Sequence, residues 1–155
     1  MTTIELKNRL KELAIRIIRL VDKLPNTPAG RAIGNQIIRS GTSPAANYRA
    51  ACLGKSDKDF LNKLKMVEEE LDETLYWLEL LMEVQLVKSE LLVDLYKENE
   101  ELLKIIVSSI TTMKAVSYTH LDVYKRQLSN CNWSMSILLF FNSSELNDPF
   151  NVSSD

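Results

Sequence analysis

The feature that most limits the fold of this chain is the position of its glycines and prolines. The 155-residue sequence contains four of each, and seven of these eight residues fall between Pro25 and Gly54. Glycine and proline are the residues that most destabilise the interior of a helix. Long segments on both sides of this window contain neither residue, and this distribution favours a helical protein.

Apolar residues recur at steps of three and four in four segments, which is the period of one helix face. The first segment ends at Pro25, and Thr27 begins the second as an N-cap followed by proline. The expected core positions are Leu6, Leu10, Leu13, Ile17, Leu20 and Leu24, then Ala32, Ile33, Ile37 and Ile38, then Phe60, Leu64, Val67, Leu71, Thr74, Leu78 and Leu81, and finally Leu92, Leu95, Leu102, Ile106, Ile110 and Met113. Four helices joined by short turns predict an all-α, antiparallel up-down-up-down four-helix bundle over residues 1–114.

The second helix contains Pro44, which cannot donate a backbone hydrogen bond and crowds the carbonyl of Ser40. We therefore expect a kinked second helix, in which Ser43 caps a continuation of the helix beyond the proline. Ser56 and Ser89 are the expected N-caps of the third and fourth helices.

Charge divides the predicted bundle into a basic half and an acidic half. Residues 1–65 carry 13 Lys and Arg against 5 Asp and Glu, whereas residues 66–116 carry 4 against 12. The whole-chain charge of −2 hides these net charges of +8 and −8. Such an asymmetry indicates an anionic partner. The competing explanation is that the two halves neutralise each other across the bundle.

Basic side chains recur at helical spacing in the first two helices. Arg9, Arg16 and Lys23 are seven residues apart and therefore lie in one row. Such rows suit contacts with nucleic-acid phosphates, whose affinity is independent of sequence and falls with salt. The candidate nucleic-acid-binding residues are Arg9, Arg16, Arg19, Lys23, Arg31, Arg39 and Arg49. The alternative is a solvated face whose cations pair with acidic residues of the third helix, namely Glu68, Glu69, Glu73, Glu79 or Glu83.

The residues around the expected kink allow two interpretations. Arg39, Asn47 and Arg49 flank it and are the polar residues that would form a binding site there. Alternatively, the side chains of Asn47 and Ser43 satisfy backbone groups that Pro44 leaves unpaired.

Aromatic residues are scarce in the basic half, where Tyr48 and Phe60 are the only two. Proteins that bind single strands stack successive bases on aromatic side chains. We therefore expect contacts with the backbone of RNA or DNA and no recognition of its sequence.

The C-terminal part of the third helix is apolar on nearly every side. Residues 75–82 read Leu-Tyr-Trp-Leu-Glu-Leu-Leu-Met, and such a helix is usually buried on more than one face. We predict that Tyr76, Trp77 and Leu80 form an interface between copies of the chain, because an exposed patch of this kind is a liability on a monomer. The alternative is that a loop or the tail of the chain covers it.

Catalytic and metal-binding patterns are missing from the sequence. The single histidine, His120, lies outside the predicted bundle, and there is no nucleophile elbow, phosphate-binding glycine loop or Cys/His ligand spacing. The acidic run 68–73 lacks the Glu-x-x-His pattern of di-metal bundles, so it is interpreted as a solvated face. Cys52 and Cys131 are too few for a disulfide framework, and Cys52 is expected to be a buried, reduced thiol. We expect no enzymatic activity, no cofactor and no metal.

The expected location is cytoplasmic, because the N-terminus lacks a secretory signal and no apolar run is long enough to span a membrane. Residues 115–155 differ from the bundle in having few charges and many Ser and Asn. Residues 116–127 resemble a peptide that recurs at the ends of proteins predicted from environmental DNA assemblies, where a sequencing adapter has been translated. We expect residues 115–155 to be a disordered tail or an assembly artefact.

The second and third helices carry a resemblance to a known family. The residues concerned are the run Gly34–Ala51, GNQIIRSGTSPAANYRAA, then Phe60, and the run Glu68–Leu81, EEELDETLYWLELL. In these residues the chain resembles the bacterial four-helix-bundle family of ribosomal RNA intervening-sequence proteins, which includes the accessory variability proteins of diversity-generating retroelements.

The resemblance implies a non-enzymatic bundle that assembles into a ring, commonly a pentamer, with a basic surface able to contact RNA or DNA. For the retroelement branch it implies that this surface serves a reverse-transcriptase complex. We therefore expect an oligomeric scaffold that associates with nucleic acid. The alternative is a protein–protein interaction bundle whose charges serve only subunit or partner contacts.

Overall fold

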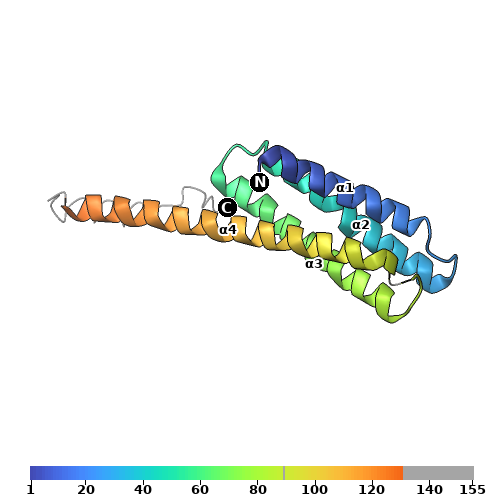
Figure 1. Ribbon diagram of the computed structural model, residues 1–155. Helices are drawn as coiled ribbons and strands as arrows, with labels where there is room; N and C mark the ends of the chain where they lie inside the picture. The colour runs from blue at the N-terminus through green and yellow to red at the C-terminus, as the bar shows by residue number, and fades with distance from the viewer. Residues whose placement is uncertain (89, 131–155) are drawn as a thin grey trace, which may run out of the picture. The chain divides into compact units, whose positions relative to one another are not determined.

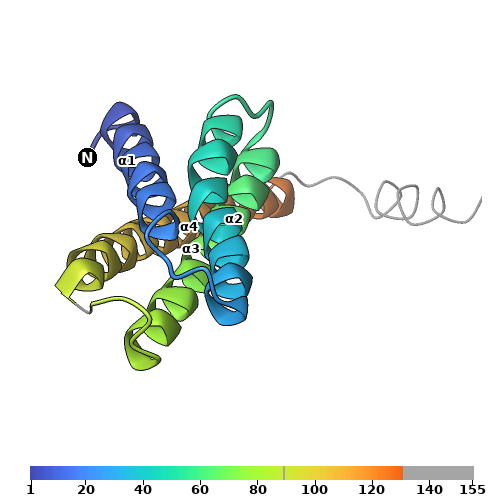
Figure 2. The same ribbon diagram turned by 90° about the vertical axis from the view of Figure 1, so that its right-hand side faces the viewer.

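The computed structural model describes residues 1–88 and 90–130, and it describes their side chains except those of Leu91 and residues 116–130. This part of the chain forms α1 (Thr3–Val21), α2 (Pro28–Ala51), α3 (Asp57–Glu83) and α4 (Glu90–Asn130). Consecutive helices run in opposite directions in the unit Met1–Lys114, which holds the bundle (Figure 1, Figure 2). The predicted all-α, up-down-up-down four-helix bundle is confirmed.

Hydroxyl side chains begin the first three helices. Thr2 accepts a hydrogen bond from the backbone N–H of Glu5, whose carboxylate accepts one from the backbone N–H of Thr2, and the two form a capping box. Thr27 caps α2 and Ser56 caps α3, as predicted, because each side chain accepts a hydrogen bond from the backbone N–H three residues further on. The predicted cap Ser89 lies outside the described residues.

The core is an apolar seam to which all four helices contribute. Its buried members include Leu6, Leu10, Leu13, Ile17 and Leu20 of α1, Leu64, Val67, Leu71, Leu78 and Leu81 of α3, and Leu92, Leu95, Leu102, Ile106 and Ile110 of α4. The expected core positions Leu24, Phe60 and Met113 are half-buried against this seam. The predicted periods of the first, third and fourth helices therefore mark their buried faces.

The second helix, α2, instead turns a face of small residues toward the core. Its buried positions are Gly30, Gly34, Ile37, Ser40, Gly41, Pro44, Tyr48 and Ala51. A Cβ atom at Gly41 would lie 2.7 Å from Cγ1 of Ile17, so glycine allows α2 to approach α1 closely. The expectation that Ala32 is a core residue is wrong, because Ala32 is exposed, and Ile33 and Ile38 are only half-buried. Of the four expected core positions of this helix, Ile37 is fully buried and confirmed, and small residues make up most of the rest of the buried face.

Pro44 lies inside α2, which continues on both sides of it as one helix. Ser43 does not begin a new segment, because its hydroxyl donates a hydrogen bond of 2.7 Å to the carbonyl of Arg39. Thr42 likewise donates to the carbonyl of Ile38. The prediction that Ser43 caps a continuation is therefore wrong, and the two hydroxyls supply donors in the turn where proline removes one. A kink of the helix axis stays a prediction.

The last helix, α4, is longer than its apolar pattern indicates. The pattern ends at Met113, whereas helical backbone continues to Asn130. No glycine or proline interrupts this stretch, and these are the residues that would break it. The proposed origin of residues 115–155 as an artefact stays a prediction, and residues 131–155 lie outside the described part of the chain.

Candidate nucleic-acid interface

Arg9, the first of the candidate cations, is held by two glutamates of α4. Its Nε and Nη2 atoms lie 2.9 and 3.0 Å from the two carboxylate oxygens of Glu98, and its Nη1 atom lies 3.1 Å from Glu101. The hydrogen bond to Glu98, followed by that to Glu101, raises the pKa of Arg9, and Arg9 in turn lowers the pKa of Glu101. A guanidinium engaged in this bidentate way has few donors left for a phosphate. Arg9 therefore serves the α1–α4 contact.

The other six candidate cations have no acidic partner within 4.0 Å in the described part of the chain. Five of them are exposed: Arg19 of α1, Lys23 in the turn that follows α1, and Arg31, Arg39 and Arg49 of α2. Arg16 of α1 is half-buried. Arg31 donates to the side-chain and backbone oxygens of Asn26 at 2.7 and 3.3 Å, which fixes it beside the start of α2. The alternative pairing with glutamates of the third helix is thus not found among these residues.

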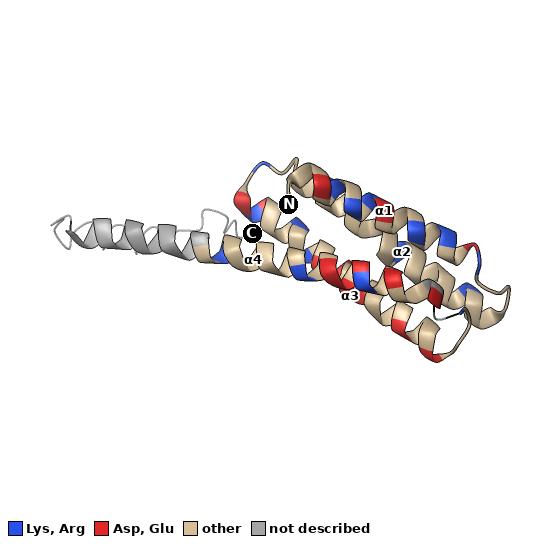
Figure 3. Cartoon of the chain, in the orientation of Figure 1, with Lys and Arg blue, Asp and Glu red and all other residues tan. Residues whose placement is uncertain are grey.

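Opposite charges are separated between the helices of the bundle. Lys and Arg follow one another along α1, whereas Asp and Glu gather on α3 and α4 (Figure 3). Among the described residues, the ion pairs that join the basic half to the acidic half are those of Arg9 with Glu98 and Glu101. Apart from Arg9, the Lys and Arg side chains of α1 and α2 form no ion pair within 4.0 Å in the described part of the chain.

Arg39 of α2 lies near enough to Glu70 of α3 for their charges to interact. Burial raises the pKa of Glu70, the neighbouring Glu73 raises it further, and the positive charge of Arg39 acts in the opposite direction. The Oε2 atom of Glu70 is buried and accepts no hydrogen bond from the described residues. Asn47, which was grouped with Arg39 around Pro44, is half-buried. Arg39 therefore faces an acidic neighbourhood, made by Glu70 and Glu73, and is not surrounded by other cations alone.

The predicted interface residues Tyr76, Trp77 and Leu80 lie close together along α3, and we call them the aromatic patch; Trp77 also packs against the core. Tyr76 is 55% exposed, and the other two are half-buried. The rings of Tyr76 and Trp77 pack edge to face with centroids 4.9 Å apart. Nε1 of Trp77 donates a hydrogen bond of 3.0 Å to Glu73, which fixes the indole on the helix surface. Within the protomer, Tyr76 is thus the most exposed member of the patch, and a hydrogen bond orients the ring of Trp77.

A buried polar layer crosses the core, and the predicted core did not include all of it. Asn99 of α4 is fully buried and donates from Nδ2 to the carbonyl of Leu71 at 2.8 Å, whereas its Oδ1 atom has no partner among the described residues. The hydroxyls of Thr74 and Ser40 share a hydrogen bond of 3.1 Å between α3 and α2. Asn99 continues the three-and-four spacing of the apolar residues around it, and this is the signal that could have identified it.

The partners of Arg9 were also missed, because the sequence pattern placed the acidic partners on the third helix. Arg9 precedes the buried Leu10, and Glu98 and Glu101 each precede a buried residue of α4. Positions that flank the seam of one helix meet the flanking positions of its antiparallel neighbour. This common position beside the seam is the signal that could have paired them.

The described residues show neither a metal-binding cluster nor a membrane-spanning helix. These contain no group of three or more His, Cys, Asp or Glu that could hold a metal ion. None of the described helices has the length and apolar character needed to cross a membrane. Cys52 is a free thiol but is half-buried, so the expectation of a buried cysteine is only partly met. The side chain of His120 lies outside the described set.

These observations define a class of protein, a four-helix bundle with a cationic surface on α1 and α2 and an aromatic patch on α3. The chain belongs to the family described as 23S rRNA-intervening sequence protein, whose sequence model matches residues 2–108. The family resemblance found in the second and third helices is confirmed at this level.

A solved structure supports the same placement. It is a protein of unknown function from the S23 ribosomal protein family of Bacteroides thetaiotaomicron VPI-5482, with 36% sequence identity to this chain and a TM-score of 0.67. The match covers 72% of this chain and 99% of that chain. No curated protein matches the sequence.

Proposed function

We propose that this chain is a non-enzymatic, oligomeric scaffold that binds nucleic acid through the cationic surface of α1 and α2. The observation that carries the proposal is that six of the seven candidate cations have no acidic partner within 4.0 Å among the described residues. A surface of unpaired cations attracts the phosphate backbone, which supplies most of the sequence-independent affinity of such proteins. The description of the family names 23S rRNA, so RNA is the first ligand to test.

Salt dependence is the expected signature of this surface. Each phosphate contact lowers the slope of log K against log salt by about 0.7 for a single strand and 0.9 for a duplex. Six contacts would therefore give slopes of roughly −4 and −5. Arg9 is left out of this count because Glu98 and Glu101 already hold it.

The experiment measures fluorescence anisotropy of labelled RNA and DNA with the full chain between about 50 and 200 mM salt. Replacing Arg19 and Lys23 with Gln removes two phosphate contacts. The slope for a single strand should therefore become less negative by about 1.4. Lys7 and Lys11 of α1 provide a control pair with the same sequence spacing, and they lie on a different face of the helix from Arg19. Their replacement by Gln should leave the slope nearer to the wild-type value.

Two outcomes would overturn the proposal of nucleic-acid binding. Clean protein that binds neither RNA nor DNA at low salt would remove it altogether. Equal effects of the Arg19/Lys23 and Lys7/Lys11 pairs would show that net charge alone is responsible and that the predicted surface has no special role.

Assembly is proposed to use the aromatic patch. Large aromatic side chains dominate the energies of protein interfaces, and truncation of a central one commonly costs more than about 2 kcal/mol. Tyr76→Ala and Trp77→Ala should therefore lower the oligomeric mass measured by size-exclusion light scattering. The expected assembly is a ring of five protomers, which would give a single mass of five times the protomer mass. A monomeric wild-type protein would contradict this part of the proposal.

We extend the proposal to the retroelement branch of the family, in which the cationic surface would serve a reverse-transcriptase complex. The test is co-purification of the full chain with a reverse transcriptase encoded beside it, in the presence and absence of nuclease. Complex formation that survives nuclease treatment would support a direct contact. Failure to co-purify in either condition would remove the reverse transcriptase as a partner.

A second candidate function is a protein–protein interaction bundle without nucleic-acid affinity. The exposure of Tyr76 and the use of Arg9 within the bundle favour it. The ratio of absorbance at 260 and 280 nm, recorded across the light-scattering peak at low salt, separates the two candidates. An oligomer free of nucleic acid that also fails to bind added RNA and DNA supports the second candidate.

A further inference from the structure

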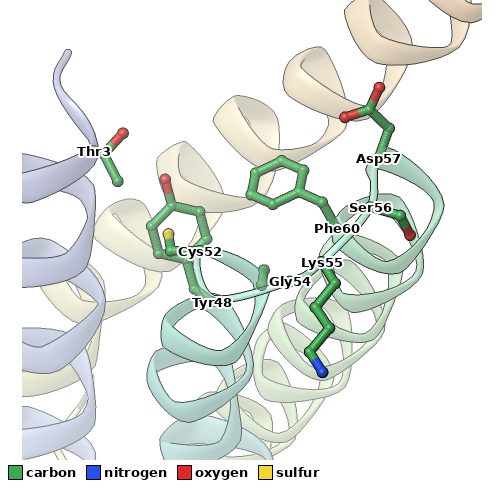
Figure 4. A pocket seen from close by; sticks show the side chains of 9 residues that line it. Thr3, Tyr48, Cys52, Gly54, Lys55, Ser56, Asp57 and Phe60 are labelled. Carbon is green, nitrogen blue, oxygen red and sulfur yellow. The ribbon is translucent and has the colours of Figure 1, made fainter.

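A hollow of about 390 Å³ lies where α1 begins and where α2 passes into α3. Its lining comes from all three of these helices and from the loop between α2 and α3 (Figure 4). Cavities that hold small organic ligands typically have volumes of about 300 to 1,000 Å³. The hollow is therefore large enough for one planar ring system, and the side chains around it decide which kind.

The centre of the hollow is lined by aromatic and hydroxyl groups. Phe60 reaches from the first turn of α3 toward Tyr48, whereas the side chain of Lys55 points away from both rings (Figure 4). Tyr48 is 6% exposed, so packing holds its ring in place, with the thiol of Cys52 and the hydroxyl of Thr3 near its own hydroxyl. Burial raises the pKa of this phenol, which therefore stays protonated and able to donate a hydrogen bond. An aromatic wall beside fixed hydrogen-bonding groups suits a flat heteroaromatic ring.

The position of the hollow connects it to the cationic surface. Tyr48 and Phe60 are the only two aromatic residues of the basic half, and the fold brings both to this hollow. The exposed charges nearby are Arg49, Lys55 and Lys58 against Asp57 and Asp59. The two acids lie in the first turn of α3, where their negative charges interact favourably with the positive end of the helix dipole. Aromatic stacking beside a net positive surface is the combination used by proteins that bind single strands.

We propose that this hollow binds one nucleobase, stacked on the ring of Phe60 and hydrogen-bonded at its edge by the hydroxyl of Tyr48. The proposal rests on the nucleic-acid binding proposed above and adds a base contact to a surface that otherwise meets phosphates. The base belongs to a single strand or to a free nucleotide, which offer the same ring. A base in a duplex is stacked and paired, and it enters a pocket only after costly extrusion. The hollow therefore also predicts a preference for single strands.

The test uses the full chain and short single strands that carry one 2-aminopurine, a fluorescent base whose emission falls when it stacks. Binding to the wild-type protein is expected to quench this emission. Phe60→Leu keeps an apolar side chain but removes the ring, and it should abolish the quenching and weaken binding by about 5- to 150-fold, the range for one stacked base. Tyr48→Phe removes only the hydroxyl and should weaken binding by about 2- to 12-fold, as expected for one hydrogen bond.

Tyr96→Phe is the matched control for Tyr48→Phe. It removes a tyrosine hydroxyl that donates to Glu79 between α4 and α3, away from the hollow. This variant should change neither the quenching nor the affinity. Loss of binding in Tyr96→Phe equal to that in Tyr48→Phe would show a general effect on the bundle and would overturn the assignment of the Tyr48 hydroxyl.

A strand of the same length built from abasic sugars tests the proposal without any protein variant. The wild-type protein is expected to bind it more weakly than the base-containing strand. Equal affinity for the two strands, with no quenching of 2-aminopurine, would overturn the base site even if Phe60→Leu failed to fold.

A final comparison identifies the source of the base and separates this proposal from the proposed function. Quenching of 2-aminopurine riboside monophosphate alone, lost in Phe60→Leu, assigns the hollow to a free nucleotide, whereas quenching only within a strand assigns it to single-stranded nucleic acid. Salt-dependent binding of strands that is indifferent to bases and to Phe60 refutes the base site and leaves the proposed function intact. Nucleotide binding without strand binding refutes the proposed function and leaves the base site, and no binding of either kind refutes both.

Discussion

Replacing Gly41 with alanine should destabilise the bundle, even though alanine is the better helix former. The new Cβ would lie 2.7, 2.8 and 3.1 Å from Cγ1, Cγ2 and Cβ of Ile17. Ile17 is fully buried and branched at Cβ, so its side chain has little freedom to turn away. Overpacking of this kind costs about 1–3 kcal/mol, whereas the change from glycine to alanine gains about 1 kcal/mol of helix propensity. The net loss in the free energy of unfolding is therefore about 0–2 kcal/mol.

Gly34 provides a matched control on the same helix. A Cβ there would lie 3.3 Å from Cδ1 of Leu24 and 3.4 Å from Cγ1 of Val21, which are the ends of half-buried side chains that can shift. Gly34→Ala should therefore keep most of the gain of about 1 kcal/mol from helix propensity. Because this gain is common to both variants, the difference between them isolates the overpacking cost of about 1–3 kcal/mol at Gly41.

The measurement is urea unfolding of both variants and the wild type, followed by circular dichroism at several protein concentrations. The concentration series is needed because the stability of an oligomer depends on the concentration of its protomers. The dependence on urea should keep its slope, since the surface exposed on unfolding does not change. If Gly41→Ala proves as stable as Gly34→Ala, the close approach of α2 to Ile17 is not what sets the distance between these helices.

Three further predictions concern polar groups of the bundle. Arg9→Met should lower the free energy of unfolding by about 1 kcal/mol at pH 7. Because Arg9 lowers the pKa of Glu101, part of this stabilisation should be lost as pH falls through that lowered pKa, and a deficit that stays the same in acid would contradict the assigned contact with Glu101. Glu70→Gln should raise stability at pH 7, because the raised pKa of Glu70 means that its ionised form is disfavoured in the folded state. The wild type regains this stability as pH falls through the raised pKa toward 4.5, so the two unfolding curves should converge in acid, and a constant gap would argue against a titrating Glu70. Asn99→Leu should stabilise the bundle by about 1 kcal/mol in urea unfolding, because it removes a buried unpaired oxygen, and a loss of stability would show that Oδ1 has a partner.

Three of the four helix faces followed from the sequence, because on these helices large apolar residues do the packing. Leu10, Leu71 and Leu102 are buried for the reason that their spacing indicates. The core face of α2 did not follow, because its contacts are made by residues such as Gly41 and Ser40, whose burial has no hydrophobic signal. A glycine or serine indicates the buried face of a helix only when the position of the neighbouring helix is known.

The candidate interface shows a similar limit. Sequence spacing placed Arg9 in one row with Arg16 and Lys23, but it could not say which helix that row faces. The nearest acidic run in the sequence lies on the third helix, whereas the partners of Arg9 come from the fourth. Pairing across a bundle depends on which helices are neighbours and on their register, and neither is encoded by residue type. The exposure of the remaining cations depends on the same geometry.

The two environments of the cations lead to different responses to salt. The pair between Arg9 and Glu98 is short and partly buried, and such pairs are screened much less than exposed charges. The exposed cations of α1 and α2 have no such protection, and at physiological ionic strength their field falls off over about 8 Å. Salt should therefore release nucleic acid from the surface at concentrations that leave the α1–α4 contact and the fold in place. Parallel measurements of binding and of unfolding against salt would reveal this separation, and a bundle that unfolds over the same range in which it loses nucleic acid would show that both depend on one set of charges.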